Sequence, residues 1–293
     1  MLPLCILSFL LSLTQAVFAG GGSSSNISIP RSSEKIVNVN LEFSSGKLEI
    51  ESDEIKDILE AEISFSTETQ RPKMTYEILE DSIGYFRLFP INKKMSILNS
   101  SDFDENHWRI FLTDDLKFDL NFSLGAAEAD FDLADLRLTN FTLENGIGEV
   151  VLKCGKQSQS SLQKIFIESG VGEISFYDIL NTNFEELYFE GGVGEYIFQF
   201  TGNHISKSAK AEITAGFSEI EIFLQKGISV EIKEEASIFT DKNYEKFEKV
   251  GPSLYRNIGF DRNDFILYLK IELGFGEFNV NWEEPISQKG SKN

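Results

Sequence analysis

The 293-residue sequence is poor in the residues on which disulfide scaffolds, metal sites and hydrolases depend, with two cysteines and two histidines. Cys5 lies in an apolar leader, so Cys154 would remain alone after its removal and no intramolecular disulfide could form. We expect Cys154 to be a semi-buried packing residue. His107 and His204 belong to no nucleophile motif. The sequence therefore predicts no catalytic residue, no metal and no cofactor.

Basic residues are also scarce, because 27 lysines and arginines face 47 aspartates and glutamates, for a formal net charge of −20. A chain this acidic is repelled by nucleic acids and by anionic lipid headgroups, so we expect no nucleic-acid partner. Cations, cationic peptides and basic protein surfaces are the partners that the charge favours. Composition leaves the oligomeric state open, and a glycan or an envelope protein as partner remains possible.

The first nineteen residues contain no charged side chain, and residues 3–13 form an apolar run that is too short to span a membrane comfortably. Val17 and Ala19 suit a signal-peptidase site, although no lysine or arginine precedes the run. We interpret residues 1–19 as a signal peptide and residues 20–34 as a flexible tether. The mature protein is then expected to be extracytoplasmic, either periplasmic or secreted, and to have no integral membrane segment.

A four-residue turn signature, Gly-x-[Gly/Ala/Ser]-Glu, recurs along the chain. The first five copies start at residues 125, 146, 170, 192 and 216, which are 21, 24, 22 and 24 residues apart, and a last copy starts at residue 274. A weaker copy at residues 44–47 ends in Lys47 instead of glutamate. Periods in this range are typical of stacked supersecondary units.

Each copy is flanked on both sides by alternating apolar residues. Leu120 and Phe122 precede the first turn, Ala129 and Phe131 follow it, and the other copies repeat this arrangement. Alternation with a period of two predicts two short strands, each with one buried face. Isolated hairpins would satisfy this pattern, but a nearly constant repeat length favours stacked coils. We therefore predict an all-β fold, a repeat β-solenoid with a less regular β-rich region before it.

We expect the solenoid to span residues 35–284, with an irregular part at 35–115, the repeats at 116–284 and a polar tail at 285–293. Residues 227–232 read as an additional strand in the long interval before the last copy. The charged segment 234–262 is interpreted as a loop or capping hairpin, because a solenoid needs an atypical end to block edge pairing.

The turn residues are the candidate functional positions. Glycine suits a tight turn and close stacking of turns, which gives structural roles to Gly146, Gly148, Gly170, Gly172, Gly192, Gly194, Gly274 and Gly276. Equivalent residues on adjacent coils lie about 4.8 Å apart, so the turn glutamates should form a column. That column comprises Glu128, Glu149, Glu173, Glu195, Glu219 and Glu277, with a second acidic column at Glu144, Glu168, Glu190 and Glu272. The columns could bind a cation or a cationic peptide. Alternatively, the carboxylates are solvated or accept hydrogen bonds from turn amides.

From Trp108 to Trp282 the chain resembles the toast-rack families of bacterial envelope proteins. These include the LiaF-like, cell-wall-active antibiotic response proteins and the putative-adhesin β-solenoids. The resemblance is carried by residues 108–112, by the segment 125–133 with the Gly-x-Gly-Glu turns that follow it, and by residues 267–280. It implies a mostly β, non-catalytic envelope domain and transfers no catalytic residues. LiaF-like members carry membrane helices before this domain, whereas this sequence has none after its leader.

Three functions follow from these observations. The first is an exported, non-enzymatic interaction or structural module that presents an acidic repeat surface. The second is a β-helical polysaccharide-cleaving enzyme, which would require a local cluster of acids instead of acids spread along the coils. The third is a sensor or regulator that responds to cationic envelope-active peptides.

Overall fold

A computed structural model describes residues 14–17, 23–65, 71–79, 82–91, 103, 105–158, 160–235 and 240–284. The predicted tail at 285–293 and most of the predicted leader lie outside these residues. The elements are β1 (Thr14–Val17), β2 (Ser23–Ile29), β3 (Ile36–Asp53), β4 (Leu59–Phe65), β5 (Pro72–Leu79), β6 (Ile83–Pro90), β7 (His107–Thr113), β8 (Lys117–Asp132), β9 (Arg137–Lys153), β10 (Leu162–Tyr177), a 3-10 turn η1 (Ile179–Thr182), β11 (Phe184–Phe200), β12 (Ser208–Gln225), β13 (Ser229–Glu234), β14 (Thr240–Tyr244), β15 (Phe247–Gly251), β16 (Leu254–Asn257) and β17 (Ile266–Glu283).

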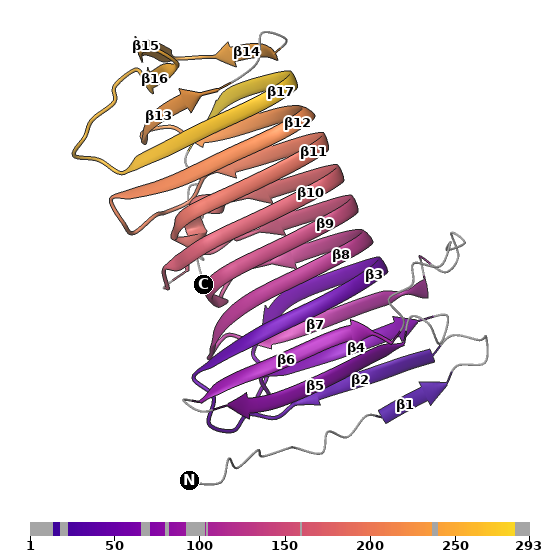
Figure 1. Ribbon diagram of the computed structural model, residues 1–293. Helices are drawn as coiled ribbons and strands as arrows, with labels where there is room; N and C mark the ends of the chain where they lie inside the picture. Colours follow the sequence, from indigo (N-terminus) through magenta and orange to yellow (C-terminus); the bar gives the residue numbers. More distant parts are fainter. Residues whose placement is uncertain are drawn as a thin grey trace, which may run out of the picture.

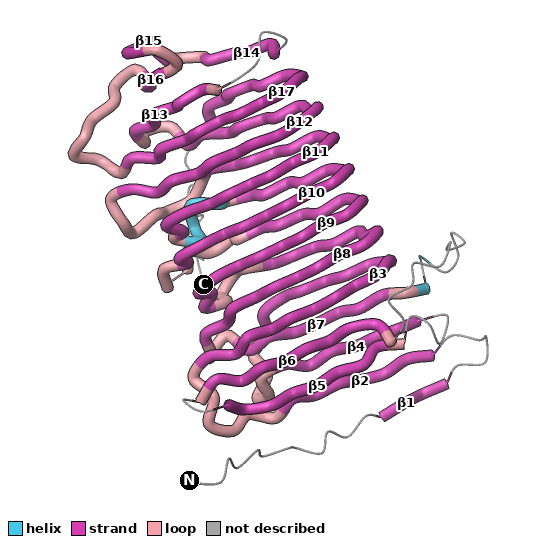
Figure 2. The backbone as a smooth tube through the Cα atoms, in the orientation of Figure 1, coloured by secondary structure: helices cyan, strands magenta, loops and turns pink. Residues whose placement is uncertain are grey.

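The long strands β3, β8, β9, β10, β11, β12 and β17 stack in that order as parallel, in-register rungs (Figure 1). Each rung has a first arm, a bend at the glycine signature and a second arm. Figure 2 shows the bends along one side of the stack and the loops between rungs along the other. The predicted β-solenoid is confirmed, and the parallel register excludes isolated hairpins. The two short strands expected around each turn are the arms of one continuous bent strand.

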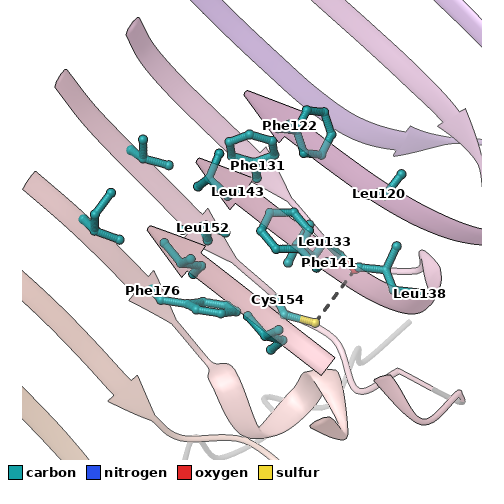
Figure 3. Close-up of a cluster of buried hydrophobic side chains, with 14 of the residues drawn as sticks. Leu120, Phe122, Phe131, Leu133, Leu138, Phe141, Leu143, Leu152, Cys154 and Phe176 are labelled. Atoms are coloured by element: carbon teal, nitrogen blue, oxygen red, sulfur yellow. Dashed lines mark hydrogen bonds between the residues drawn. The ribbon is translucent and has the colours of Figure 1, made fainter. Parts of the chain in front are cut away.

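The core lies between the two arms of the rungs. Phe122 on the first arm of β8 packs edge-on against Phe131 on the second arm, with ring centroids 4.9 Å apart. Phe131 also meets Phe141 of the next rung at 5.6 Å (Figure 3). Edge-to-face pairs of this kind add about 0.5–1.5 kcal/mol beyond area burial. The phenylalanines therefore tie the arms together within a rung and tie each rung to the next.

Cys154 belongs to this core and is fully buried, not semi-buried. Its thiol hydrogen bonds to the carbonyl of Lys156 at 3.2 Å, and Figure 3 shows the sulfur among leucine and phenylalanine side chains. Burial raises the pKa of the Cys154 thiol to about 12, so the thiol stays protonated at neutral pH. This environment matches the packing role predicted from the sequence.

The region before the repeats continues both sheets of the solenoid. The weak copy of the signature is a full rung, since β3 pairs with β8 from Ile36 to Ile50. Strands β6 and β7 extend its two arms, and β5, β4 and β2 add antiparallel strands. The irregularity predicted for residues 35–115 therefore applies to the segments that follow β3, and not to β3 itself.

The flexible tether expected at residues 20–34 is wrong for Ser23–Ile29, which form β2 against β4. Ile27 and Ile29 are buried there, opposite Ala61 and Leu59. Serine-rich composition suggested a linker, but the alternation of isoleucine with polar residues gives this segment one apolar face that pairing on a sheet can bury.

The segment after β12 caps the stack, as predicted. Strand β13 pairs with the first arm of β17, and β14 pairs with its second arm, so together they form a final split rung. Strands β15 and β16 form an antiparallel hairpin beside β13. Buried Glu234 joins the two halves by accepting hydrogen bonds from Lys242 and from Tyr244, the latter at 2.6 Å. Strand β17 follows the capping segment in the sequence, but in the structure it lies between β12 and the cap strands β13 and β14.

The bends require glycine mainly because the backbones of successive rungs approach each other closely. A Cβ on Gly172 would lie 1.9 Å from the carbonyl oxygen of Gly148, and the φ of Gly172 is +147°. At Gly194, which lacks a positive φ, a Cβ would lie 1.8 Å from the Gly172 oxygen. The first glycines of the signature are also crowded, with oxygens 2.2–2.7 Å from the added Cβ at Gly146, Gly170, Gly192 and Gly274.

Gly172→Ala should therefore destabilise the stack, because alanine both adopts a strained φ and displaces the neighbouring rung. We expect the free energy of unfolding to fall by at least about 2 kcal/mol. The measurement is urea unfolding followed by circular dichroism. Gly155→Ala is the matched control, since its added Cβ meets nothing within 4 Å. Equal urea midpoints for the two variants would contradict the stacking argument.

Candidate functional site

The turn glutamates form the column that the sequence predicts. The register pairs Glu149 with Glu173, Glu173 with Glu195, and Glu195 with Glu219, and Glu128 and Glu277 extend this run at its two ends. The glutamates are exposed. The bends therefore present one line of carboxylates about 4.8 Å apart at the backbone.

The second acidic column is shorter than the first. Glu144, Glu168 and Glu190 are adjacent in register and exposed. Thr214 then separates Glu190 from Glu272. The predicted second column is consequently continuous only over β9, β10 and β11.

Between the two columns runs a line of exposed apolar side chains that the sequence reasoning missed. The second residue of the signature is 53% exposed at Ile147, 48% at Val171 and 47% at Val193, and the line continues with Phe217 and Phe275. The two phenylalanine rings stack with centroids 4.9 Å apart. We call these five residues the apolar ridge, and the ridge with both acidic columns the corner surface. The signal was present in the sequence, because this position is apolar in all six full copies.

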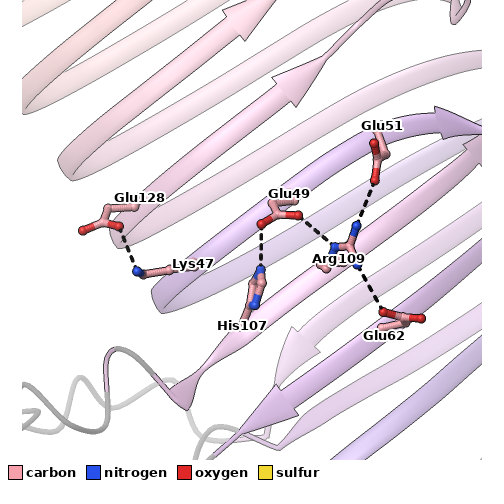
Figure 4. A network of polar contacts seen from close by, with 7 residues as sticks. All are labelled: Lys47, Glu49, Glu51, Glu62, His107, Arg109 and Glu128. Atoms are coloured by element: carbon pink, nitrogen blue, oxygen red, sulfur yellow. Dashed lines mark hydrogen bonds and ion pairs between the residues drawn. The ribbon is translucent and has the colours of Figure 1, made fainter.

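The electrostatics of the corner surface differ between its ends. Lys47 of β3 meets Glu128 at 3.6 Å, and Figure 4 shows this pair beside a second ionic cluster. In that cluster Arg109 contacts Glu49 at 2.9 Å, as well as Glu51 and Glu62. Basic residues therefore offset the acids at the end of the stack that begins with β3.

Further along the stack, in the described part of the chain, no ion pair involves Glu149, Glu173 or Glu195. The pKa of the Glu219 carboxyl is raised by partial desolvation and then by the charges of Glu277 and Glu195. Like charges in register thus repel one another, and water and salt screen that repulsion. The line of turn glutamates that follows the Lys47–Glu128 pair extends from β9 to β17.

Within the residues that the structure describes, no three His, Cys, Asp or Glu side chains are grouped to hold a metal ion. The corner glutamates extend along a line instead of converging on one point. The corner surface can therefore pack against apolar groups along the ridge and attract positively charged groups on either side of it.

No helix in the described ranges is long and apolar enough to cross a membrane.

Comparisons with known proteins point to one family. Residues 18–177 match the model of the N-terminal domain of toast_rack, DUF2154. No curated protein sequence matches the chain. A solved structure of a putative cell adhesion protein from Clostridium sporogenes is 20% identical, with a TM-score of 0.46, and the match covers 89% of this chain and 100% of that one. A putative adhesin from Bacteroides fragilis is 12% identical, with a TM-score of 0.45, and 89% of this chain and 98% of that one are covered.

Because Glu219 lies between two other carboxylates, Glu219→Gln should stabilise the protein at neutral pH. The pKa of this carboxyl is raised in the folded protein, so its ionisation lowers the stability. The loss is complete above the folded pKa and disappears as the pH falls from that value to the unfolded pKa of about 4.5. Because the side chain is exposed, we expect a gain of only about 0.3 kcal/mol at pH 7. Thermal unfolding at low salt measures the gain, which should shrink toward pH 5 and in high salt.

Glu128→Gln is the control for this measurement, because Glu128 faces Lys47 instead of a second acid on that side. It should give no gain at pH 7. If both variants were equally stabilised, the effect would come from net charge and not from the column.

Proposed function

The chain belongs to the toast-rack family, and on that basis, together with its corner surface, we propose that it is an extracytoplasmic, non-enzymatic interaction module of the cell envelope. Its partner carries basic side chains on both sides of an apolar strip and docks along the bends of the solenoid. The observation that carries this proposal is the apolar ridge, whose side chains are about half exposed between two lines of carboxylates.

The ridge favours a protein or peptide partner over a simple cation. A folded protein rarely keeps a continuous line of large apolar side chains in water unless the line is used for contact. A metal ion would make no use of Val171 and Val193, whereas an amphipathic chain would cover them and bring its basic groups to Glu173 and Glu195. Charge attraction would speed the encounter, and burial of the ridge would supply lasting affinity.

The geometry also limits the partner's dimensions. Ridge residues repeat at about 4.8 Å, close to the 5.4 Å pitch of an α-helix. A helix with one apolar stripe could lie along several rungs with its basic residues on either side of the stripe. Basic segments of envelope proteins and cationic envelope-active peptides both have this chemistry, so a sensor of such peptides is one form of the same proposal.

Export is the second part of the proposal, and the leader at residues 1–19 supports it. Cleavage after Ala19 would leave Gly20 as the new amino terminus and would remove β1, which pairs with β2 in the described residues. Strand β2 would keep its pairing with β4.

The binding proposal is tested with a synthetic peptide of lysine and leucine whose leucines share one face of a helix. We expect saturable binding in calorimetric titration. Glu173→Gln/Glu195→Gln should weaken it about fivefold at low salt, since each exposed charge pair is worth a few tenths of a kcal/mol or more. Val171→Ser/Val193→Ser should weaken it about tenfold at any salt concentration, because it removes apolar contact.

The charge-matched control is Glu77→Gln/Glu248→Gln, which changes two exposed glutamates on β5 and β15. It should leave the affinity unchanged. The proposal fails if this control weakens binding as much as the column variant does, or if an all-lysine peptide binds as tightly as the lysine–leucine peptide.

Export is tested by expressing the full chain in a bacterium and determining the amino terminus of the protein recovered outside the cytoplasm. We expect a sequence that begins at Gly20. Recovery only from the cytoplasm, with residues 1–19 retained, would contradict this part of the proposal without affecting the peptide titration.

A further inference from the structure

A second surface feature, separate from the corner surface, lies on the outer face of the first arms near the cap. It is a cleft of about 300 Å³ that crosses β11, β12, β17 and β13. Tyr188 and Tyr268 line it from β11 and β17, and we call it the tyrosine cleft. Its size is at the lower end of the range for sites that bind small ligands.

Two rows of side chains form the walls of the tyrosine cleft. One row runs through Tyr188, Glu212, Lys270 and Lys233, which are consecutive in register. The other runs through Lys210, Tyr268 and Glu231. The two rows are two residues apart along each strand, so they flank a trough parallel to the axis of the stack. The tyrosines stand in opposite rows on strands two apart in the stack.

The charges in these walls are balanced by ion pairs. Lys270 contacts Glu212 at 2.5 Å, and Arg256 of β16 contacts Glu231 at 2.6 Å. Lys210 lies 4.0 Å from Glu186. The cleft is lined by three lysines and two glutamates. Together with Arg256, Glu186 and Glu235, which form ion pairs with them, the region has four cationic and four anionic groups in a protein with a net charge of −20. It offers both hydrogen-bond donors and acceptors without a strong preference for either sign of charge.

The Tyr188 ring is held in place by its neighbours. The Tyr188 hydroxyl donates to Glu186 at 2.9 Å, and Lys164 Nζ lies 5.1 Å from the centre of the Tyr188 ring. Tyr268 is 37% exposed, so part of its ring is available to a ligand. A flat ring in this position can pack against the apolar C–H face of a ligand while paired charges contact polar groups at the ligand's edge.

We propose that the tyrosine cleft binds a neutral saccharide. A sugar ring combines an apolar face with hydroxyl groups that donate and accept hydrogen bonds, which matches tyrosine rings beside paired lysines and glutamates. An anionic ligand would compete with Glu212, Glu231 and Glu186 for the same cations. An apolar ligand would desolvate those charges without replacing their contacts with water. The proposal is independent of the corner surface, since no ridge or column residue lines the cleft.

The test titrates the purified protein with three neutral oligosaccharides, cellotetraose, chitotetraose and xylotetraose, and with the anionic tetragalacturonate, by calorimetry. We expect saturable binding of at least one neutral probe and none of tetragalacturonate. Tyr268→Ala should weaken binding at least tenfold. Tyr85→Ala on β6, a tyrosine on the outer face at the other end of the same sheet, is the matched control and should bind as wild type.

A second measurement uses the unmodified protein, so that a folding defect in Tyr268→Ala is not mistaken for loss of saccharide binding. Saturation with the neutral probe should shift the ring NMR signals of Tyr188 and Tyr268 and leave that of Tyr85 in place. Glu173→Gln/Glu195→Gln should bind the saccharide normally, which separates this site from the corner surface. The proposal is overturned if no neutral probe binds, if tetragalacturonate binds more tightly than they do, or if only the Tyr85 signal shifts.

Discussion

The close approach of backbones at the bends is the constraint on which the rest of the structure depends. With carbonyl oxygens 1.8–2.8 Å from where a Cβ would stand on the signature glycines of the next rung, adjacent rungs cannot slip past one another without a clash. A slip of one residue would also turn every inward side chain to the outside. Glycine crowding and the apolar alternation therefore select the same register, and the core pairs such as Phe122 with Phe131 follow from it.

The same register determines what the protein presents to solvent. Because each rung places its signature directly beside the next, one apolar residue and one glutamate per repeat become a ridge and a column. The column does not stabilise the isolated protein, since its carboxylates repel one another, and about half of each ridge side chain is exposed to water. The phenylalanine-rich core offsets the repulsion within the column.

The outer faces of the arms are under weaker constraint than the bends. Side chains there need only be compatible with solvent and with their neighbours in register, so each region of the sheet can carry its own chemistry. Near β3 this face holds the Arg109 cluster, and near the cap it holds Tyr188 and Tyr268 beside paired charges. A solenoid of this kind can thus carry a repeated surface along its bends and local sites on its arms.

Much of the architecture could be predicted from sequence, because its signals are local and repeated. The inward positions, the solenoid, the glutamate column and the capping segment are all confirmed. The tether was wrong because a serine-rich composition masked the alternation at Ile27 and Ile29. The ridge was missed although its residues were visible, since exposure of an apolar turn residue depends on what packs over it.

By itself, the sequence determined which residues face inward, where each rung bends and that equivalent positions align, because these properties arise from alternation and glycine placement within one repeat. Only the tertiary structure decided which rung lies beside which. The insertion of β17 between β12 and β13 depends on the path of the chain across the capping segment, which no local pattern encodes. That arrangement brings Tyr188, Lys210, Tyr268 and Glu231 to one cleft from four separate strands, and no spacing in the sequence relates them.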